Sequence, residues 1–298
     1  MDNQSGVLTI AHTKQKYVRQ AVNLALSIRI HSPGIPIALV TNLPSDELNE
    51  IFDRIIEWNF SNTPALISKL SMYEMTPFQE TVFIDADCLV LKPLNSIFHY
   101  FAWDDFGVFG FNKRHPKWFQ EIDLIKKEVP AETYVGFNGG FYYFKKSMSA
   151  KKVFELAQSF FSEYDRLKIG YFGNHPGDEP LISLAMAKVG LKAKKNNDID
   201  DIIAAPAGKR GKLEIDVLAG ECYFQKHNRI VEPYIMHFAS DDSCFEYLRE
   251  ELKLRASYYK YLSKIPVILL TSWAWIKWLL MTFIPLYYFI AKNKIKNT

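Results

Sequence analysis

Short apolar runs on either side of an amphipathic segment make up the first part of the chain. Residues 6–13 (GVLTIAHT) and 35–41 (IPIALVT) are the apolar runs, and each ends in polar residues. Between them, residues 17–30 carry apolar side chains at the spacing of one helix face. A strand, a helix and a second strand in this order predict a βαβ unit, in which helices cover a parallel sheet.

The same kind of pattern continues to about residue 250. The other predicted elements are strands over residues 81–90, 106–111, 140–144 and 234–238 and helices over residues 64–74, 149–164 and 179–189. We therefore predict one α/β domain over residues 1–250, with a Rossmann-like mixed sheet flanked by helices, and a separate tail over residues 251–298.

The tail contains an almost uninterrupted apolar segment over residues 265–291, flanked by lysines between residues 260 and 296. Its length would allow a spanning helix, which needs about 20 apolar residues. However, Lys277 lies near the middle, where a charge costs roughly 3 kcal/mol, and three tryptophans cluster there although tryptophan prefers the interface. We favour a membrane-associating helix that lies in the interface, or returns near Pro285, over a spanning helix or a core helix.

The distribution of charge agrees with an interaction between residues 260–296 and a membrane surface. The net charge of +3 divides into +7 from residue 251 onward, where eight basic residues face one acidic residue, and −4 for residues 1–250. A basic, apolar tail fits an anionic membrane, whereas an acidic body argues against nucleic-acid binding. The polar N-terminus and three widely separated cysteines predict a cytosolic body. We therefore expect a peripheral or monotopic protein at the cytoplasmic face of a membrane.

Two acidic residues, Asp85 and Asp87, interrupt the apolar run over residues 81–90. Carboxylates spaced by two residues on a strand point to the same face and can approach one cation. Hard divalent ions such as Mn²⁺ and Mg²⁺ prefer oxygen ligands, and two buried carboxylates would be costly without such a partner. The alternative is a pair of solvated acids where the strand meets a loop.

Two other interpretations, an aspartyl-phosphate phosphatase and a phosphate-binding loop, fit the sequence poorly. An aspartyl-phosphate phosphatase would need threonine two residues after the second aspartate, where this chain has Leu89. The segment AGKRGK over residues 207–212 lacks the spacing of a phosphate-binding loop.

The segment SKLSMYEMTPFQETVFIDADCLVLKPL, over residues 68–94, resembles the centre of the GT-A glycosyltransferases. It is most similar to glycosyltransferase family 8, whose bacterial members build lipooligosaccharide. The shared pattern is a basic residue at a helix start, a short loop, an apolar strand that ends in D-x-D, and an apolar turn with proline. The resemblance implies the GT-A fold and a nucleotide-sugar donor.

Further matches in the same order imply roles for individual residues. Four groups are implied: Ala11, His12 and Tyr17 for the nucleotide; Lys69, Asp85, Asn138, Gly139 and Gly140 for the donor; Asp85, Asp87 and His237 for the metal; Asp178 and Glu179 for catalysis. Each group has a structural alternative, because glycine pairs form turns, a single histidine often belongs to a core, and acids favour helix N-termini.

The sequence departs from the family pattern in two places. Glu179 stands where the most similar members have glutamine, and a carboxylate there could stabilise an oxocarbenium-like transition state or attack it covalently. The family's glycine and K-P-W motif after the late histidine is replaced by residues 239–243, ASDDS. The diphosphate partner must then come from elsewhere, and Lys209, Arg210 and Lys212 are the candidates.

These observations together predict a metal-dependent glycosyltransferase of polysaccharide biosynthesis. It would move a hexose from a nucleotide sugar, most simply a UDP-sugar, to a glycan or lipid-linked acceptor with retention of configuration, using Mn²⁺ or Mg²⁺. The alternative is a non-catalytic, membrane-bound protein of the same fold that binds nucleotide sugars or glycans.

Overall fold

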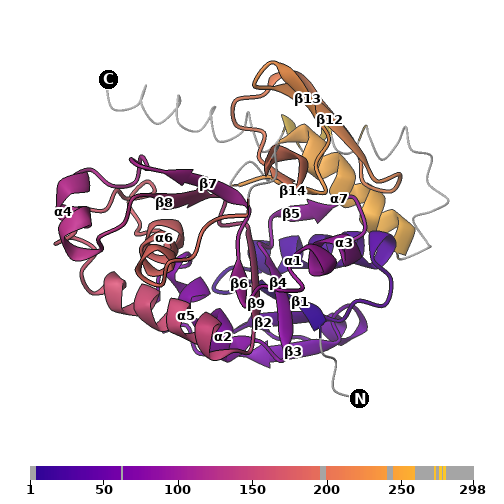
Figure 1. The fold of residues 1–298 in the computed structure, drawn as a ribbon. Helices are drawn as coiled ribbons and strands as arrows, with labels where there is room; N and C mark the ends of the chain where they lie inside the picture. The colour runs from indigo at the N-terminus through magenta and orange to yellow at the C-terminus, as the bar shows by residue number, and fades with distance from the viewer. Residues whose placement is uncertain are drawn as a thin grey trace, which may run out of the picture.

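A mixed six-stranded sheet forms the centre of the protein (Figure 1). The computed structural model describes residues 5–61, 63–194, 199–239, 244–258 and residues 272, 275, 276, 278 and 279. The strand order is β3-β2-β1-β4-β9-β6, in which the first four strands are parallel and β9 is antiparallel to both of its neighbours. Its strands are β1 (Ser5–Ile10), β2 (Ile37–Thr41), β3 (Arg54–Glu57), β4 (Glu80–Ile84), β6 (Phe106–Gly107) and β9 (Phe141–Lys145). The predicted mixed α/β sheet is confirmed.

Helices cover both faces of this sheet, so each strand contributes to two cores. Val82 packs in the core beneath α1, whereas the next residue, Phe83, packs in the core beneath α5 and α6. Figure 1 shows α1 on one side of the sheet and α5 on the other. The helices are α1 (Gln15–His31), α2 (Met72–Met75), α3 (Asn95–Tyr100), α4 (Ile122–Glu128), α5 (Met148–Phe161), α6 (Asp178–Lys188) and α7 (Phe245–Tyr258). Burial on both faces explains why the strands have continuous apolar sequences.

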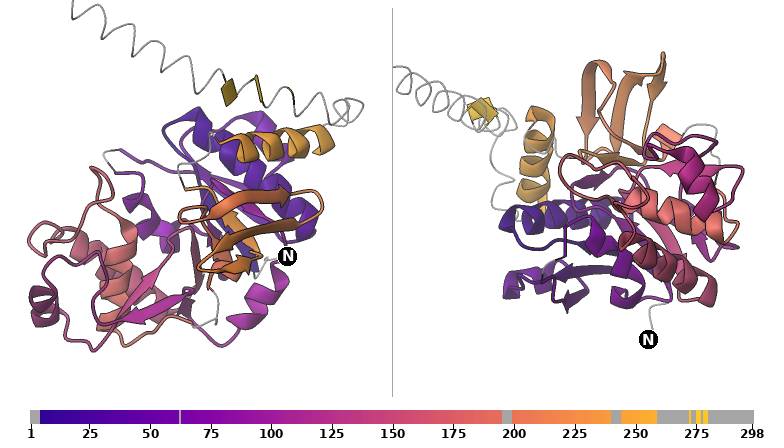
Figure 2. Two further views of the ribbon diagram at one scale, coloured as in Figure 1. Left: turned by 90° about the horizontal axis from the view of Figure 1, so that it is seen from above. Right: turned by 90° about the vertical axis from the view of Figure 1, so that its left-hand side faces the viewer.

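Three smaller sheets extend the central one. They consist of β10 (Ile203–Ala204), β14 (Ile235–His237) and β5 (Cys88–Val90); β11 (Arg210–Asp216), β12 (Glu221–Lys226) and β13 (Arg229–Val231); and β7 (Gly110–Lys113) with β8 (Tyr134–Phe137). Figure 2 shows the β11–β13 sheet, in orange, standing out from the body of the protein. The pairing of β14 with β5 matters most for the site, because it places His237 opposite Cys88.

Several predicted elements have different boundaries in the structure. The strand predicted over residues 81–90 is two strands, β4 and β5, separated by a turn over residues 85–87. The helix predicted over residues 64–74 is a 3₁₀ helix, η2 (Ile67–Ser71), followed by the single turn of α2. The strand predicted over residues 106–111 is divided between β6 and β7. In each case the chain bends where the apolar pattern alone indicates one continuous element.

The predicted boundary after residue 250 falls inside α7. Leu254 of this helix is fully buried in the same core as α1, and Glu251 pairs with Arg19 of α1 at 3.2 Å. Most of the apolar segment 265–291 lies outside the described residues. Within the described ranges, no helix has both the length and the apolar character required to cross a bilayer.

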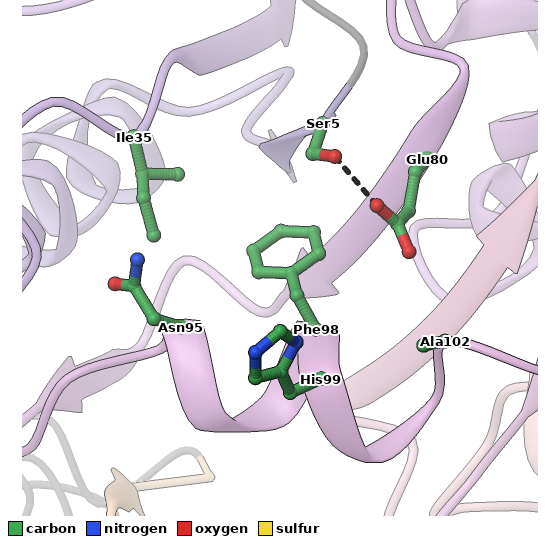
Figure 3. Close-up of a pocket in the computed structure, with 7 residues that line it drawn as sticks. All are labelled: Ser5, Ile35, Glu80, Asn95, Phe98, His99 and Ala102. Carbon is green, nitrogen blue, oxygen red and sulfur yellow. Dashed lines mark hydrogen bonds between the residues drawn. The ribbon is translucent and has the colours of Figure 1, made fainter.

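A shallow pocket lies at the edge of the central sheet where β1 and β4 begin (Figure 3). Ser5 donates a hydrogen bond of 2.5 Å to the Glu80 carboxylate, and Phe98 and His99 of α3 form the opposite wall. The residues considered below follow the other ends of the same strands, so this pocket is separate from them.

Candidate active site

The aspartate pair lies in the turn between β4 and β5. The backbone N–H of Asp85 donates to the Gly140 carbonyl at 3.0 Å, and the N–H of Phe238 donates to the Asp87 carbonyl at 3.1 Å. These bonds tie the turn to β9 on one side and to β14 on the other. The two side chains therefore converge through a turn, and not through the shared strand face that the sequence spacing indicated.

His237 of β14 faces both carboxylates. Its Nε2 atom lies 3.2 Å from Asp87 Oδ1 and 3.7 Å from Asp85 Oδ2, and its Nδ1 atom lies 2.8 Å from Asn138 Oδ1. When Nδ1 donates to Asn138, the lone pair of a neutral imidazole points from Nε2 toward two negative oxygens. That arrangement is stable only with a positive charge between them, either a proton on Nε2 or a cation.

Burial and the neighbouring charges have opposing effects on the pKa values of these groups. Burial alone lowers the pKa of His237, but the hydrogen bond to Asp87 and the charges of both carboxylates outweigh it, so the pKa of His237 is raised. Burial also raises the pKa of Asp85, while the contact with His237 outweighs burial and lowers the pKa of Asp87. The raised pKa of His237 and the lowered pKa of Asp87 both reflect the attraction between this imidazole and the carboxylates.

The donor atoms of this cluster fit a hard divalent cation. Among the described residues, the ligand atoms of Asp87, Cys88 and His237 lie within 4.8 Å of one another. Burial raises the pKa of the Cys88 thiol well above its usual value, so Cys88 stays protonated and packs in the strand, as its position suggests. The predicted ligand Asp85 is not part of this group: its Oδ2 atom lies 3.7 Å from His237 Nε2 and accepts a hydrogen bond from Lys69. Two carboxylates and an imidazole suit Mn²⁺ or Mg²⁺.

Lys69, on η2, lies beneath the aspartate turn. Its ammonium donates to Asp85 Oδ2 at 2.7 Å and to the Gly139 carbonyl at 2.9 Å, and it lies 3.7 Å from Asp178 Oδ2. Burial alone would lower the pKa of Lys69, but the charges of Asp178 and Asp85 outweigh it and raise the pKa. Lys69 therefore remains charged and joins the metal-ligand candidates to the residues at the start of α6.

The segment Asn138–Gly140 forms the turn between β8 and β9, and both glycines are required by close contacts. A methyl group at Gly140 would lie 2.6 Å from His237 Nδ1, and one at Gly139 would lie 2.8 Å from Glu179 Cγ. Either contact would displace a predicted site residue. The Asn138 side chain closes the turn by accepting a bond of 2.9 Å from the Gly140 N–H.

Asp178 and Glu179 occupy the first turn of α6, but neither is the N-cap, which is Gly177. Asp178 is buried and accepts a hydrogen bond from the Tyr142 hydroxyl. Glu179 accepts a bond of 2.7 Å from the Gly139 N–H. Burial and the neighbouring Asp178 raise the pKa of Glu179 to about 7, against the smaller effect of the Gly139 bond. Both side chains thus point into the cluster, where the helix N-terminus favours negative charge.

The predicted nucleotide-binding residues lie at the same edge of the sheet, after β1. Ala11 is buried, and its N–H donates to the Val40 carbonyl at 3.0 Å. The His12 ring stacks on Phe60 with a centroid distance of 3.9 Å, and burial lowers the pKa of His12, which keeps the imidazole neutral. Tyr17 of α1 packs against the first core. Because β1 and β4 are parallel neighbours, these residues follow the same strand edge as Asp85.

The candidate diphosphate partners stay a prediction. Arg210 donates to Asn228 at 2.9 Å, and Lys212 pairs with Glu214 at 2.7 Å, so both are engaged on the β11–β13 sheet. Lys209 lies at the turn before β11.

Two residues near the site were not found from the sequence. Tyr142 lies in the run FYYF of β9, where any aromatic residue is explained by core packing. Phe60 lies in a loop after β3 and has no motif around it. Their positions depend on contacts between distant segments, which a pattern of local spacing does not contain.

Comparison with proteins of known structure identifies the architecture. An active-site mutant of the galactosyltransferase LgtC, in which glutamate replaces glutamine, superposes with a TM-score of 0.52 at 15% identity, over 78% of this chain and 87% of that one. The bifunctional glycosyltransferase WbbM superposes with a TM-score of 0.53 at 11% identity, over 85% of this chain and 50% of that one. This is the GT-A fold. The resemblance noted in the sequence is confirmed at the level of the fold.

A curated protein is also similar to part of the chain. The putative UDP-glucuronate:xylan alpha-glucuronosyltransferase 4 of Arabidopsis thaliana is 29% identical over 161 residues, or 45% of this chain. The chain spans 28% of the length of that relative. No family model matches the sequence. The compared proteins agree with the expectation of a nucleotide-sugar glycosyltransferase.

Proposed function

We propose that this protein transfers a hexose from a nucleotide sugar, most simply a UDP-sugar, in a reaction that depends on a divalent metal. The observation that carries the proposal is the convergence of Asp87 and His237 beside Asp85, at the edge of a GT-A sheet. Glu179 accepts from the Gly139 N–H, and Asp178 lies 3.7 Å from the Lys69 ammonium that also contacts Asp85. The relatives are themselves glycosyltransferases, which supports the proposal.

In this proposal each group has a separate task. Asp87, His237 and Asp85 would hold Mn²⁺ or Mg²⁺, which supplies positive charge beside a diphosphate leaving group. Lys69 keeps Asp85 and Asp178 in place, and Asp178 and Asn138 orient the sugar. Glu179 would face the anomeric carbon as a carboxylate, where it stabilises developing positive charge or attacks the carbon. Either role of Glu179 is consistent with retention of configuration.

Turnover of a donor panel tests the proposal. We expect release of UDP from at least one of UDP-glucose, UDP-galactose, UDP-N-acetylglucosamine and UDP-glucuronate in the presence of Mn²⁺, and none after addition of EDTA. Thermal unfolding with the same donors should shift upward, since a ligand at a hundred times its Kd adds about 2.7 kcal/mol. Binding without turnover would instead support a non-catalytic binding protein, and neither binding nor turnover would refute the proposal.

We also propose that the tail attaches the enzyme to the cytoplasmic face of a membrane, where a glycan or lipid-linked acceptor would be available. Trp275, Ile276 and Leu279 expose 49%, 52% and 41% of their surfaces, and Trp275 packs on Phe245 of α7 at 4.9 Å. Exposed apolar side chains among lysines fit an anionic interface. The full chain should sediment with vesicles that contain phosphatidylglycerol; absence of binding at low salt would refute attachment.

A further inference from the structure

We propose that Tyr142 is a positioning residue that holds Asp178 for recognition of the donor sugar. The inference rests on the proposed function, because it names a residue that acts behind the sugar-binding carboxylate. The observation behind it is a single hydrogen bond in the centre of the protein, from the Tyr142 hydroxyl to Asp178 Oδ2.

Packing against other aromatic rings fixes the orientation of the Tyr142 ring independently of Asp178. Tyr142 is fully buried on β9, opposite Phe83 of β4. Its ring lies 5.5 Å from Phe137 in an edge-on contact, 6.0 Å from Phe83 and 6.4 Å from Phe106, all between centroids. With three aromatic neighbours around the ring, the hydroxyl has one direction available, and it points toward the start of α6.

The Tyr142 hydroxyl gives Asp178 a hydrogen bond in addition to its contact with Lys69. Asp178 is 2% exposed, and burying a polar group is costly unless it is hydrogen-bonded. Lys69 lies 3.7 Å from Asp178 Oδ2, but donates its shortest bonds to Asp85 and the Gly139 carbonyl. Burial and the charge of Asp178 raise the pKa of Tyr142 well above its usual value, so the hydroxyl remains a donor at neutral pH.

Both contacts of Asp178 use the same oxygen, which determines what the carboxylate offers to a ligand. With Oδ2 held by Tyr142 and Lys69, the arrangement leaves Oδ1 to accept a hydrogen bond from a sugar hydroxyl. A carboxylate that is already oriented loses less entropy when it binds, which favours sugars whose hydroxyl meets Oδ1. Tyr142 would thus contribute to affinity for the sugar, and not for the nucleotide.

The next residue provides a matched control. Tyr143 is also fully buried, and its hydroxyl also donates to a carboxylate, that of Glu80. Because successive residues of a strand point to opposite faces, Tyr143 serves the other core, and its partner Glu80 lies at the far end of β4. Tyr143→Phe therefore removes a comparable hydroxyl without approaching Asp178.

The experiment compares the affinity for UDP with that for UDP-sugars. Isothermal titration in the presence of Mn²⁺ gives the Kd of UDP and of the four donors named above for wild type, Tyr142→Phe, Tyr143→Phe, Asp178→Asn and the Tyr142→Phe/Asp178→Asn double variant. For the donor preferred by the wild type, Tyr142→Phe should weaken binding about tenfold, the effect of losing one hydrogen bond to a charged group. The Kd of UDP should not change, and Tyr143→Phe should behave as wild type.

The double variant tests whether Tyr142 acts through Asp178. Once Asp178 is asparagine, removal of the Tyr142 hydroxyl should cause no further loss of donor affinity. Unchanged donor affinity in Tyr142→Phe, or equal losses for UDP and donor, would overturn the inference and leave the proposed function standing. If Tyr142→Phe does not fold, unchanged donor affinity in Asp178→Asn would overturn it. A wild type that binds neither UDP nor any donor would refute the proposed function itself.

Discussion

Replacing Asp87 by asparagine should lower the rate of donor turnover by roughly a thousandfold, since a catalytic metal supplies several kcal/mol of charge stabilisation. Asparagine keeps the shape of the side chain but removes the negative charge beside His237 Nε2, which lies 3.2 Å away. The fold should survive, because the backbone bond from Phe238 to the Asp87 carbonyl is unaffected. Steady-state release of UDP and thermal unfolding of the same preparation measure the two effects.

A surface aspartate provides the control for this substitution. Asp123 of α4 is exposed, and Asp123→Asn should leave both the rate and the unfolding temperature unchanged. Wild-type turnover by Asp87→Asn would contradict the assignment of the metal ligands. A loss of turnover accompanied by unfolding would show that Asp87 stabilises the turn, and not the reaction.

The second large effect concerns pH and Glu179. Its pKa is raised to about 7, first by burial and then by Asp178, so it is mostly protonated at pH 6 and mostly ionised at pH 8. If the reaction uses the carboxylate, the rate with saturating Mn²⁺ should fall about tenfold for each pH unit below the pKa. Glu179→Gln should have a much lower rate and should lack this dependence. A wild-type rate that is constant down to pH 5.5 would contradict the role of Glu179.

The raised pKa of Glu179 also affects stability, and in the opposite direction: an increase in pH that raises the rate should lower the free energy of unfolding. A carboxyl group whose pKa is raised on folding binds its proton more tightly in the folded state, so it stabilises the protein when protonated and loses this contribution as pH rises toward 7. Glu179→Gln removes that loss. The variant should therefore gain unfolding temperature relative to wild type at pH 8 and show little difference at pH 5, which distinguishes a lost functional group from a damaged fold.

The sequence predicted the central elements because their signals are local. The apolar runs of β1, β2 and β4 and the helical spacing of α1 and α5 follow from burial on a period of two or 3.6 residues. The β11–β13 sheet was not predicted, although β12 alternates exposed and buried positions; the register of its pairing with β11 shifts between Arg210 and Glu214.

The site residues that could be predicted were also those with a local signal in the sequence. The acidic pair was visible because charged residues seldom interrupt a buried strand, and family resemblance added His237 and Glu179. The structure places His237 beside the acidic pair through the antiparallel pairing of β5 and β14, whereas Glu179 approaches from α6 and accepts from the Gly139 N–H. By contrast, the contact of Tyr142 with Asp178 joins residues 36 positions apart inside the core, and nothing in the run FYYF distinguishes it from packing.

A crystal structure of the full chain soaked with Mn²⁺ and UDP, with anomalous data at the manganese edge, tests the central claim most directly. We predict one strong anomalous peak within bonding distance of Asp87 Oδ1 and His237 Nε2, with diphosphate oxygens on its open side. A peak elsewhere, or UDP bound without a metal at this turn, would contradict the account.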